Sequence, residues 1–300
     1  MTVCIEKPPG EDSMGTPLRI RRIFDFSRGI PIFPILILLP FLFFGLFGDY
    51  VAPQDPNRPH FGDTLRPPFF QERGKIEYPL GTDHLGRDVL SRLICGTSVS
   101  LQVGLLSVIL AGLIGSIVAI LSGYLGGWQD TILMRLTDTM MSLPYIMIAI
   151  VLAAILGPSK NNIILILVIL GWTGYARVLR AEVLRVKQAE FISLAIVAGS
   201  SKFRIMLKHV FPNIVNTLVV MATLQVGIVI IAESSLSFLG VGVPPPDPAW
   251  GSMVAEGRAY ISSAWWLSTW PGLSILLVVL SCNMLGDWLR VRLDPKFRQI

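Results

Sequence analysis

Six long apolar runs alternate with polar segments along this chain. A helix needs about 20 mostly apolar residues to cross the hydrocarbon core of a bilayer, and the shorter runs fit with tilt or with basic side chains that extend from their ends to the interface. The runs lie near Ile30–Tyr50, Val99–Leu125, Thr139–Gly157, Ile163–Tyr175, Ile214–Gly240 and Leu273–Trp288. The pattern predicts an all-α polytopic membrane protein with six transmembrane helices.

The second and third runs carry further features. Small residues recur at every fourth position of the second run, at Ser107, Ala111, Gly115, Ala119 and Gly123. Small side chains in this register let two helix backbones approach closely, within one chain or between two. Pro144 comes early in the third run and is expected to kink that helix, because proline lacks a backbone N–H.

The composition supports a membrane protein and excludes other classes. Charged residues make up only 15% of the chain, whereas a soluble domain carries charge on about a quarter of its positions. The net charge of +5 is therefore interpreted through membrane topology, and no nucleic-acid partner is expected. Cys4, Cys95 and Cys282 match no metal or disulfide spacing. No A-x-A-like site follows the first apolar run, so a cleavable signal peptide is not expected.

Basic residues gather on one side of the predicted spans. They occur in the N-terminal tail, after the fourth span and in the C-terminal tail, whereas the loop between the fifth and sixth spans has only Arg258. This bias marks the cytoplasm, and an even number of spans makes both termini cytoplasmic. The predicted parts are a cytoplasmic tail (1–29), the first transmembrane helix (30–50), an extracytoplasmic loop (51–98), a core with five transmembrane helices and a cytoplasmic loop at 177–213 (99–288), and a cytoplasmic tail (289–300).

That cytoplasmic loop contains a helical hairpin, EFISLAIVAGSSKFRIMLKHVFPN, from Glu190 to Asn213. Gly199 is expected to end its first helix in the left-handed conformation, Ser200 or Ser201 to cap the second, and Pro212 to stop the second before the fifth span. Apolar residues follow the i, i+3, i+4, i+7 spacing of an amphipathic helix: Phe191, Leu194, Ala195 and Ala198 in the first half, and Phe203, Met206, Leu207 and Val210 in the second.

Such short helices are not stable alone in water, so their apolar stripes must be buried against something. One interpretation packs the hairpin on the chain's own spans, or lays it in the membrane interface with Lys202, Arg204 and Lys208 facing lipid phosphates. The other docks one of its helices into a groove on another protein.

The hairpin resembles the EAA loop of binding-protein-dependent ABC importer permeases. Ala195, Gly199 and Pro212 match this motif, whereas Ser193 and Leu194 stand where Glu and the first Ala are usual, and Glu190 is a candidate for the missing acidic group. The resemblance implies a coupling helix that seats in a cleft of an ATP-hydrolysing subunit. Its implied coupling residues are Glu190, Ser193, Leu194, Ala195, Gly199, Phe203 and Pro212.

Three other stretches are similar to permeases for dipeptides, oligopeptides and nickel, specifically to the C-type, or second, permease of such systems. They are GTDHLGRDVLSRLICG (Gly81–Gly96), LSFLGVGVPPPDPAWG (Leu236–Gly251) and LGDWLRVRLDPKFR (Leu285–Arg298). Ser98 departs from the family pattern, which often has Arg there. The resemblance runs from about Arg28 to the C-terminus and implies an ABC type I importer permease fold in the bacterial inner membrane.

A nucleotide-binding loop is missing from the sequence. Such a loop needs GxxxxGK[ST], and the one Gly-Lys pair, Gly74–Lys75, is followed by Ile76. We therefore expect no enzyme activity and no cofactor in this chain, with ATP and Mg bound by partners. The resemblance implies as partners two ABC ATPases, a second non-identical permease and an extracytoplasmic solute-binding protein, besides membrane lipid.

Glu233 is the ionisable residue that stands out inside a predicted span. A carboxylate at membrane depth is costly, so it should face protein or water. It is either part of the translocation path or gate, or a hydrogen-bonding residue that fixes helix packing or lies at the outer interface; the packing alternative is favoured.

Alternative functions remain at this stage. A secondary transporter often shows internal repeats or chains of intramembrane acids, and neither is evident here. An intramembrane enzyme would need a catalytic cluster that three scattered histidines do not supply. Within the permease family, the substrate is expected to be a short peptide, with nickel or another small solute as the alternative.

Overall fold

The computed structural model describes residues 31–293, and this part of the chain is helical, with connecting loops and one isolated β-bridge. The predicted tail at 1–29, Ile30 of the first predicted span, and residues 294–300 of the second tail lie outside it. The helices are α2 (Ile32–Val51), α3 (Val89–Ile120), α4 (Gly127–Met141), α5 (Tyr145–Leu156), α6 (Lys160–Lys187), α7 (Glu190–Val197), α8 (Lys202–Ile205), α9 (Phe211–Phe238), α10 (Trp250–Arg258) and α11 (Trp266–Leu293). A 3-10 turn, η1 (Phe61–Asp63), follows α2, and the π-helical turns η2 (Leu121–Leu125) and η3 (Met206–Val210) follow α3 and α8.

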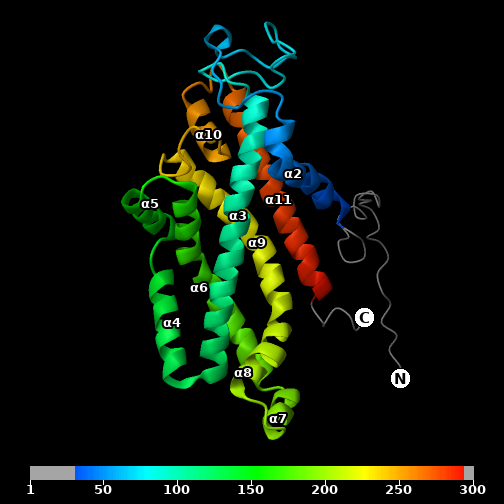
Figure 1. Cartoon of the computed structure of the whole chain (residues 1–300), viewed down its shortest axis with the longest axis vertical. Coiled ribbons are helices and arrows are strands. Elements are labelled where there is room, and N and C mark those ends of the chain that lie inside the picture. Colours follow the sequence, from blue (N-terminus) through cyan, green and yellow to red (C-terminus); the bar gives the residue numbers. More distant parts are fainter. Residues whose placement is uncertain (1–30, 294–300) are drawn as a thin grey trace, which may run out of the picture.

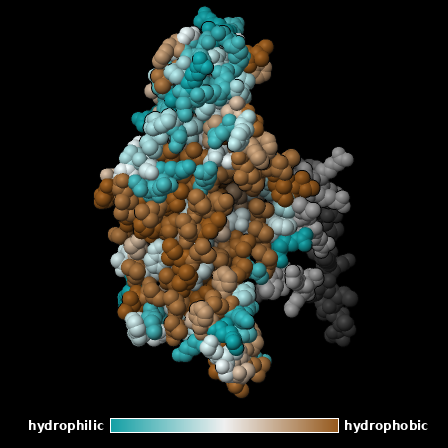
Figure 2. Space-filling model, in the orientation of Figure 1, coloured by the Kyte–Doolittle hydropathy of each residue, from teal (hydrophilic) through white to brown (hydrophobic). Residues whose placement is uncertain are grey.

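The long helices form an elongated bundle (Figure 1). Within residues 31–293, five helical runs are long and apolar enough to cross a membrane, and the bent pair α4–α5 makes a sixth if it counts as one span. The loop at 52–88 and α10, together called the cap, lie at one end, and α7 and α8 lie at the other, called the hairpin end (Figure 1). Hydrophobic residues cover the middle of the face shown in Figure 2, and hydrophilic residues cover the cap. The fold is therefore that of an all-α polytopic membrane protein.

The third predicted span is broken rather than kinked. Its expected range, Thr139–Gly157, includes a junction where α4 and α5 meet at 88°. Pro144 lies at this junction as the N-cap of α5, in an extended conformation. Proline lacks the N–H that would continue α4 and also disfavours the helical conformation at the residue before it. The effect of Pro144 was expected at this position, but it ends one helix and begins another.

Two helices extend beyond their apolar runs. α3 begins at Val89, so residues 89–98 of the predicted extracytoplasmic loop are helical. The side chain of Asp88 caps α3 by accepting hydrogen bonds from the Ser91 N–H at 2.8 Å and the Ser91 hydroxyl at 2.6 Å. α6 likewise continues past Tyr175 to Lys187, because the polar residues that follow are good helix formers with no Pro or Gly among them.

The small residues of α3 pack against α6 of the same chain. All five members of the stripe are buried, and α3 and α6 make the most extensive helix contact in the described residues. A Cβ atom on Gly115 would lie 2.5 Å from Cβ of Tyr175 and 2.6 Å from the backbone oxygen of Trp172. The partner of this stripe, which sequence left open, is therefore an intramolecular helix.

Adding one methyl group at Gly115 is expected to destabilise the bundle. Gly115→Ala places an atom against the backbone of α6, and overpacking of this kind costs about 1–3 kcal/mol. Gly174→Ala, on α6, is the matched control, because a Cβ atom there meets nothing within 4 Å. Thermal denaturation of the purified protein in detergent should show a lower Tm for Gly115→Ala alone. Equal Tm values for the two variants would contradict the close packing.

Candidate functional site

The turn of the hairpin has the geometry of a Schellman motif. The Ser200 N–H donates to the Ala195 oxygen and the Gly199 N–H to the Ile196 oxygen, both at 3.0 Å. Gly199 has a φ of +77°, a conformation that glycine adopts without the cost that a Cβ atom brings. Ser201 rather than Ser200 is the cap of the second helix, accepting a hydrogen bond from the Arg204 N–H at 3.3 Å. The expected left-handed conformation of Gly199 at the end of the first helix is confirmed.

Pro212 does not stop the second helix of the hairpin. α8, η3 and α9 form one continuous run, Lys202–Phe238, with Pro212 in the first turn of α9. The Phe211 N–H bonds to the Met206 oxygen, five residues back. This wider π-helical turn accommodates the proline ring and the missing N–H within a continuous helix. The hairpin is therefore joined rigidly to the fifth span.

The hairpin faces the bundle with residues other than the predicted stripes. Ile192 and Ile205 are buried and join the core cluster between α3, α6 and α9. Of the predicted stripes, Val210 is buried, and Ala195 and Met206 are half-buried. The other stripe positions, Phe191, Leu194, Ala198, Phe203 and Leu207, are exposed. The chain's own spans therefore bury the predicted stripes only in part. The α7 residue that packs into the core is Ile192, which is not a stripe residue.

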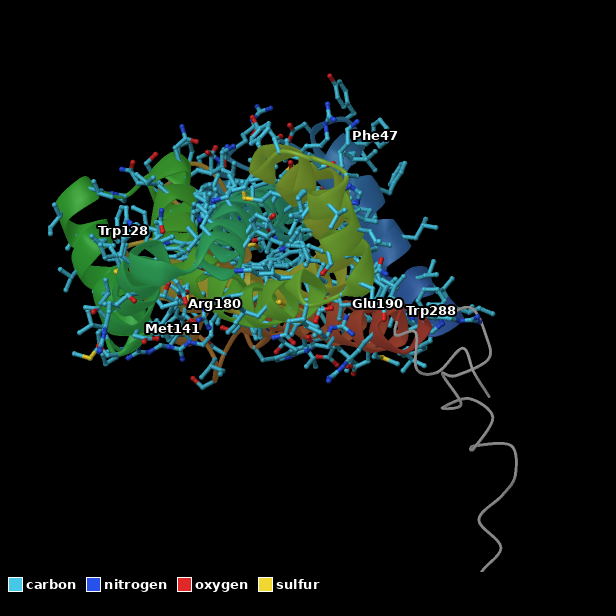
Figure 3. The ribbon with its side chains drawn as sticks, turned by 90° about the horizontal axis from the view of Figure 1, so that it is seen from below. Phe47, Trp128, Met141, Arg180, Glu190 and Trp288 are labelled. Atoms are coloured by element: carbon cyan, nitrogen blue, oxygen red, sulfur yellow. The ribbon has the colours of Figure 1, made fainter. Side chains whose placement is uncertain are left out.

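An apolar surface therefore remains at the hairpin end. Leu194 is 68% exposed, Val197 85% and Phe203 69%. Glu190 and Ser193 are exposed on the same helix, α7, as Leu194. Figure 3 views the molecule from this end, with Glu190 labelled at the start of α7. Large apolar side chains exposed beside polar ones mark a surface that fits a partner.

Glu233 is fully buried in the part of α9 nearer the cap. Its carboxylate accepts hydrogen bonds from three hydroxyl groups: Ser237 at 2.7 Å, Ser100 of α3 at 3.3 Å and Ser234 at 3.4 Å. The Ser237 oxygen also accepts from the Val243 N–H at 3.3 Å, in the loop that leads to α10. These contacts connect α3, α9 and the α10 loop around one carboxylate, which is the arrangement that a buried polar group needs.

The cap contains a buried ion-pair network that sequence analysis missed. The Arg87 guanidinium donates to Asp83 at 2.6 Å and to Glu256 of α10 at 2.9 Å. Arg92 of α3 donates to both carboxylate oxygens of Glu256 at 3.1 Å and lies 3.4 Å from Asp83. Asp83 and Arg87 lie in the loop before α3, where no helical spacing signals their pairing, and Glu256 is far along the chain.

Three further contacts join residues 82–93 to residues 250–266. Trp250 donates its indole N–H to the Leu93 oxygen, and Trp266 donates to the Thr82 oxygen, both at 3.2 Å. The His84 ring stacks on Tyr260 with centroids 5.8 Å apart. The C-terminal part of the predicted extracytoplasmic loop is thus packed against α10 and α11.

The cap also has its own local ion pairs. The Asp63 carboxylate accepts a hydrogen bond from Lys75 at 2.8 Å and another from Arg66. The hydrogen bond from Lys75 is the main cause that lowers the pKa of Asp63, and the Arg66 guanidinium adds to it.

Asp83, His84 and Glu256 place ligand atoms within 4.8 Å of one another, but two guanidinium groups, those of Arg87 and Arg92, already neutralise the carboxylates. This cluster therefore does not suit a metal cation.

The apolar bundle, with an exposed hairpin between α6 and α9 at one end and the tied cap at the other, is that of an integral membrane protein. A family model for the binding-protein-dependent transport system inner membrane component matches residues 111–299. The chain is 40% identical over 264 residues to the di/tripeptide transport system permease protein DppC of Pseudomonas aeruginosa (strain UCBPP-PA14), which covers 88% of this chain and 87% of that protein.

Two dipeptide transport system permease proteins named DppC are similar over still longer stretches. The Haemophilus influenzae protein is 39% identical over 276 residues, covering 92% of this chain and 93% of that protein. The Escherichia coli K12 protein is 40% identical over 285 residues, covering 95% of each. This chain belongs to the family of binding-protein-dependent transport system inner membrane components.

Proposed function

We propose that this chain is the C-type permease subunit of an ATP-driven ABC importer and forms half of a path for short peptides. Its relatives are named as dipeptide or di/tripeptide permeases and match between 88% and 95% of this chain. In the proposed complex it pairs with a second, non-identical permease, two ABC ATPases that bind ATP and Mg, and an extracytoplasmic solute-binding protein.

The proposed orientation places the hairpin end and both termini in the cytoplasm of a bacterial cell, and the cap outside the inner membrane. The described basic residues support it. Arg177, Arg180, Arg185 and Lys187 end α6, and Lys202, Arg204 and Lys208 belong to the hairpin. An excess of Lys and Arg marks cytoplasmic segments.

The exposed hairpin is the observation that carries the proposal. Its apolar residues Leu194, Val197 and Phe203 are left uncovered by the chain's own spans, and its helices are continuous with, or adjacent to, α6 and α9. A groove on an ATPase that buries these residues would move α7 when the ATPases close. Movement of α7 would then tilt the attached spans and drive alternating access.

Peptides are favoured over nickel as the substrate. Within residues 31–293, the one group of His, Cys and acidic side chains close enough to hold a metal is the cap cluster, whose carboxylates pair with Arg87 and Arg92. Soft or imidazole ligands suit nickel, and a path lined by them is not found among the described residues.

Reconstitution with and without partners tests this function. The complete complex in liposomes should accumulate a labelled dipeptide only when ATP, the binding protein and both ATPases are present. The isolated chain should move none, because the nucleotide-binding machinery is on other subunits. Dipeptide movement by the isolated chain would instead identify a secondary transporter.

Conservative replacement of Glu233 separates its two candidate roles. Glu233→Gln keeps the size and one oxygen acceptor for the Ser237 hydroxyl, so we expect near-normal yield and uptake. Glu233→Leu leaves three buried hydroxyls without their acceptor, and each unmade hydrogen bond costs about 1–3 kcal/mol, so its folded yield should fall sharply. Normal yield with lost uptake in Glu233→Gln would assign Glu233 to the translocation path.

A further inference from the structure

Two ion pairs join the half-span α4 to α6. Of the 15 residues of α4, Thr137 alone is buried, and Met140 is half-buried against the apolar core. Arg180 donates through Nε and Nη2 to the two oxygens of Asp130, each at 2.6 Å, and Arg177 donates to Asp138. A bidentate arginine–carboxylate pair fixes orientation as well as distance.

The turn that leads into α4 is also held against α6. The ammonium group of Lys187 lies 5.7 Å from the ring centroid of Tyr124, which is buried in η2. A Cβ atom on Gly123 would lie 2.8 Å from the Val183 side chain, so the backbones of η2 and α6 are in close contact. The contacts of α4 and η2 with α6 therefore run from Arg177 to Lys187.

The same part of α6 leads directly into the hairpin. α6 ends at Lys187, and α7 begins at Glu190. In Figure 3, Arg180 is labelled on this side of the molecule, with Trp128 and Met141 marking the two ends of α4. At its far end α4 meets α5 at the 88° break before Pro144, and α5 packs on α6 and α9 in the outer half of the bundle.

We propose that Asp130–Arg180 and Asp138–Arg177 are positioning pairs that make α4 move with α6 and the hairpin, with residues 142–144 as the hinge. The inference rests on the proposed coupling function of the hairpin. Without these pairs, α6 moves with the ATPase but α4 follows this movement only in part. Each ATP hydrolysed then transports less dipeptide. Proline and the short segment before it supply the helix break that such a hinge requires.

The double variant Asp130→Asn/Asp138→Asn tests this in the complete complex in liposomes. The ratio of dipeptide transported to ATP hydrolysed should fall about threefold or more, the size expected for losing two partly exposed ion pairs. Glu182→Gln is the matched control, because it removes an Arg–carboxylate pair with Arg185 that lies wholly within α6. That control should keep the wild-type ratio.

A covalent link in place of one pair makes the test independent of folding defects. Asp130→Cys/Arg180→Cys should lose coupling as isolated and regain it when a short bifunctional thiol reagent joins the two helices. If linking abolishes uptake, or if neither double variant changes the ratio while the ATPases still co-purify, α4 does not move with α6 and the inference is wrong. Failure of the ATPases to co-purify with the unmodified chain would overturn the proposed function instead.

Discussion

Leu194→Glu is expected to abolish ATP-driven uptake while leaving the subunit folded. Leu194 is 68% exposed on α7, so the substitution disturbs few contacts inside this chain. In the proposed complex, however, the ATPase buries this position, and a desolvated carboxylate without a partner is strongly unfavourable. Loss of a central apolar contact typically weakens an interface by about 2 kcal/mol or more, roughly thirtyfold in affinity.

Co-purification of the ATPases with the tagged permease measures this effect, together with the Tm of the permease alone. Ile76→Glu is the matched control, since Ile76 is 89% exposed in the cap at the opposite end of the bundle. We expect it to retain the ATPases fully. Normal ATPase binding by Leu194→Glu would show that the exposed hairpin surface is not the docking surface.

Glu256→Gln is expected to destabilise the cap strongly. Asp83 and Glu256 balance the charges of Arg87 and Arg92, and the side chain of Arg92 is only 3% exposed. Removing one carboxylate leaves an uncompensated buried guanidinium. Breaking a buried pair in this way costs about 3–5 kcal/mol, whereas replacing a whole pair with apolar residues is often neutral.

The double variant Glu256→Gln/Arg92→Met should therefore be more stable than Glu256→Gln alone. Thermal denaturation of the purified variants would show this as a partial recovery of Tm. Glu72→Gln, at an exposed position of the same loop, is the charge-matched control and should leave the Tm unchanged. A double variant less stable than Glu256→Gln would mean that Arg92 contributes chiefly by packing.

Sequence patterns located the helices well where apolar runs coincide with helix length. The predicted first and fifth spans correspond to α2 and α9 within a few residues at each end, whereas α11 (Trp266–Leu293) extends beyond the predicted sixth span, Leu273–Trp288, at both ends. Errors occurred where helices carry polar residues. The first turns of α3 were not predicted as helix because they contain the polar residues Ser91 and Arg92. The end of α6 was predicted too early because basic residues follow Tyr175.

The two ends of the bundle differ in how far they were predictable. Gly199 and the serine cap were readable because a tight turn depends on local backbone geometry. The sequence could not predict that Leu194 is exposed. Apolar residues follow one another on α7, so the predicted stripe with Phe191 and Leu194 is not its sole apolar face: Ile192 and Ala195 are also three residues apart. Only tertiary packing, in a cluster with residues of α3, α6 and α9, selects Ile192 as the buried residue.

The amino-acid sequence by itself determined that this chain is an all-α membrane protein with a glycine-turned hairpin and no nucleotide-binding loop. These features depend on side-chain hydropathy, on helix length and on local backbone preferences, which act over a few residues. The tertiary structure alone decided which charges meet. Glu256 reaches Arg87 and Arg92, and Asp130 reaches Arg180, across long sequence separations, because an ion pair requires atoms to lie within a few ångströms and only the folded bundle sets that distance.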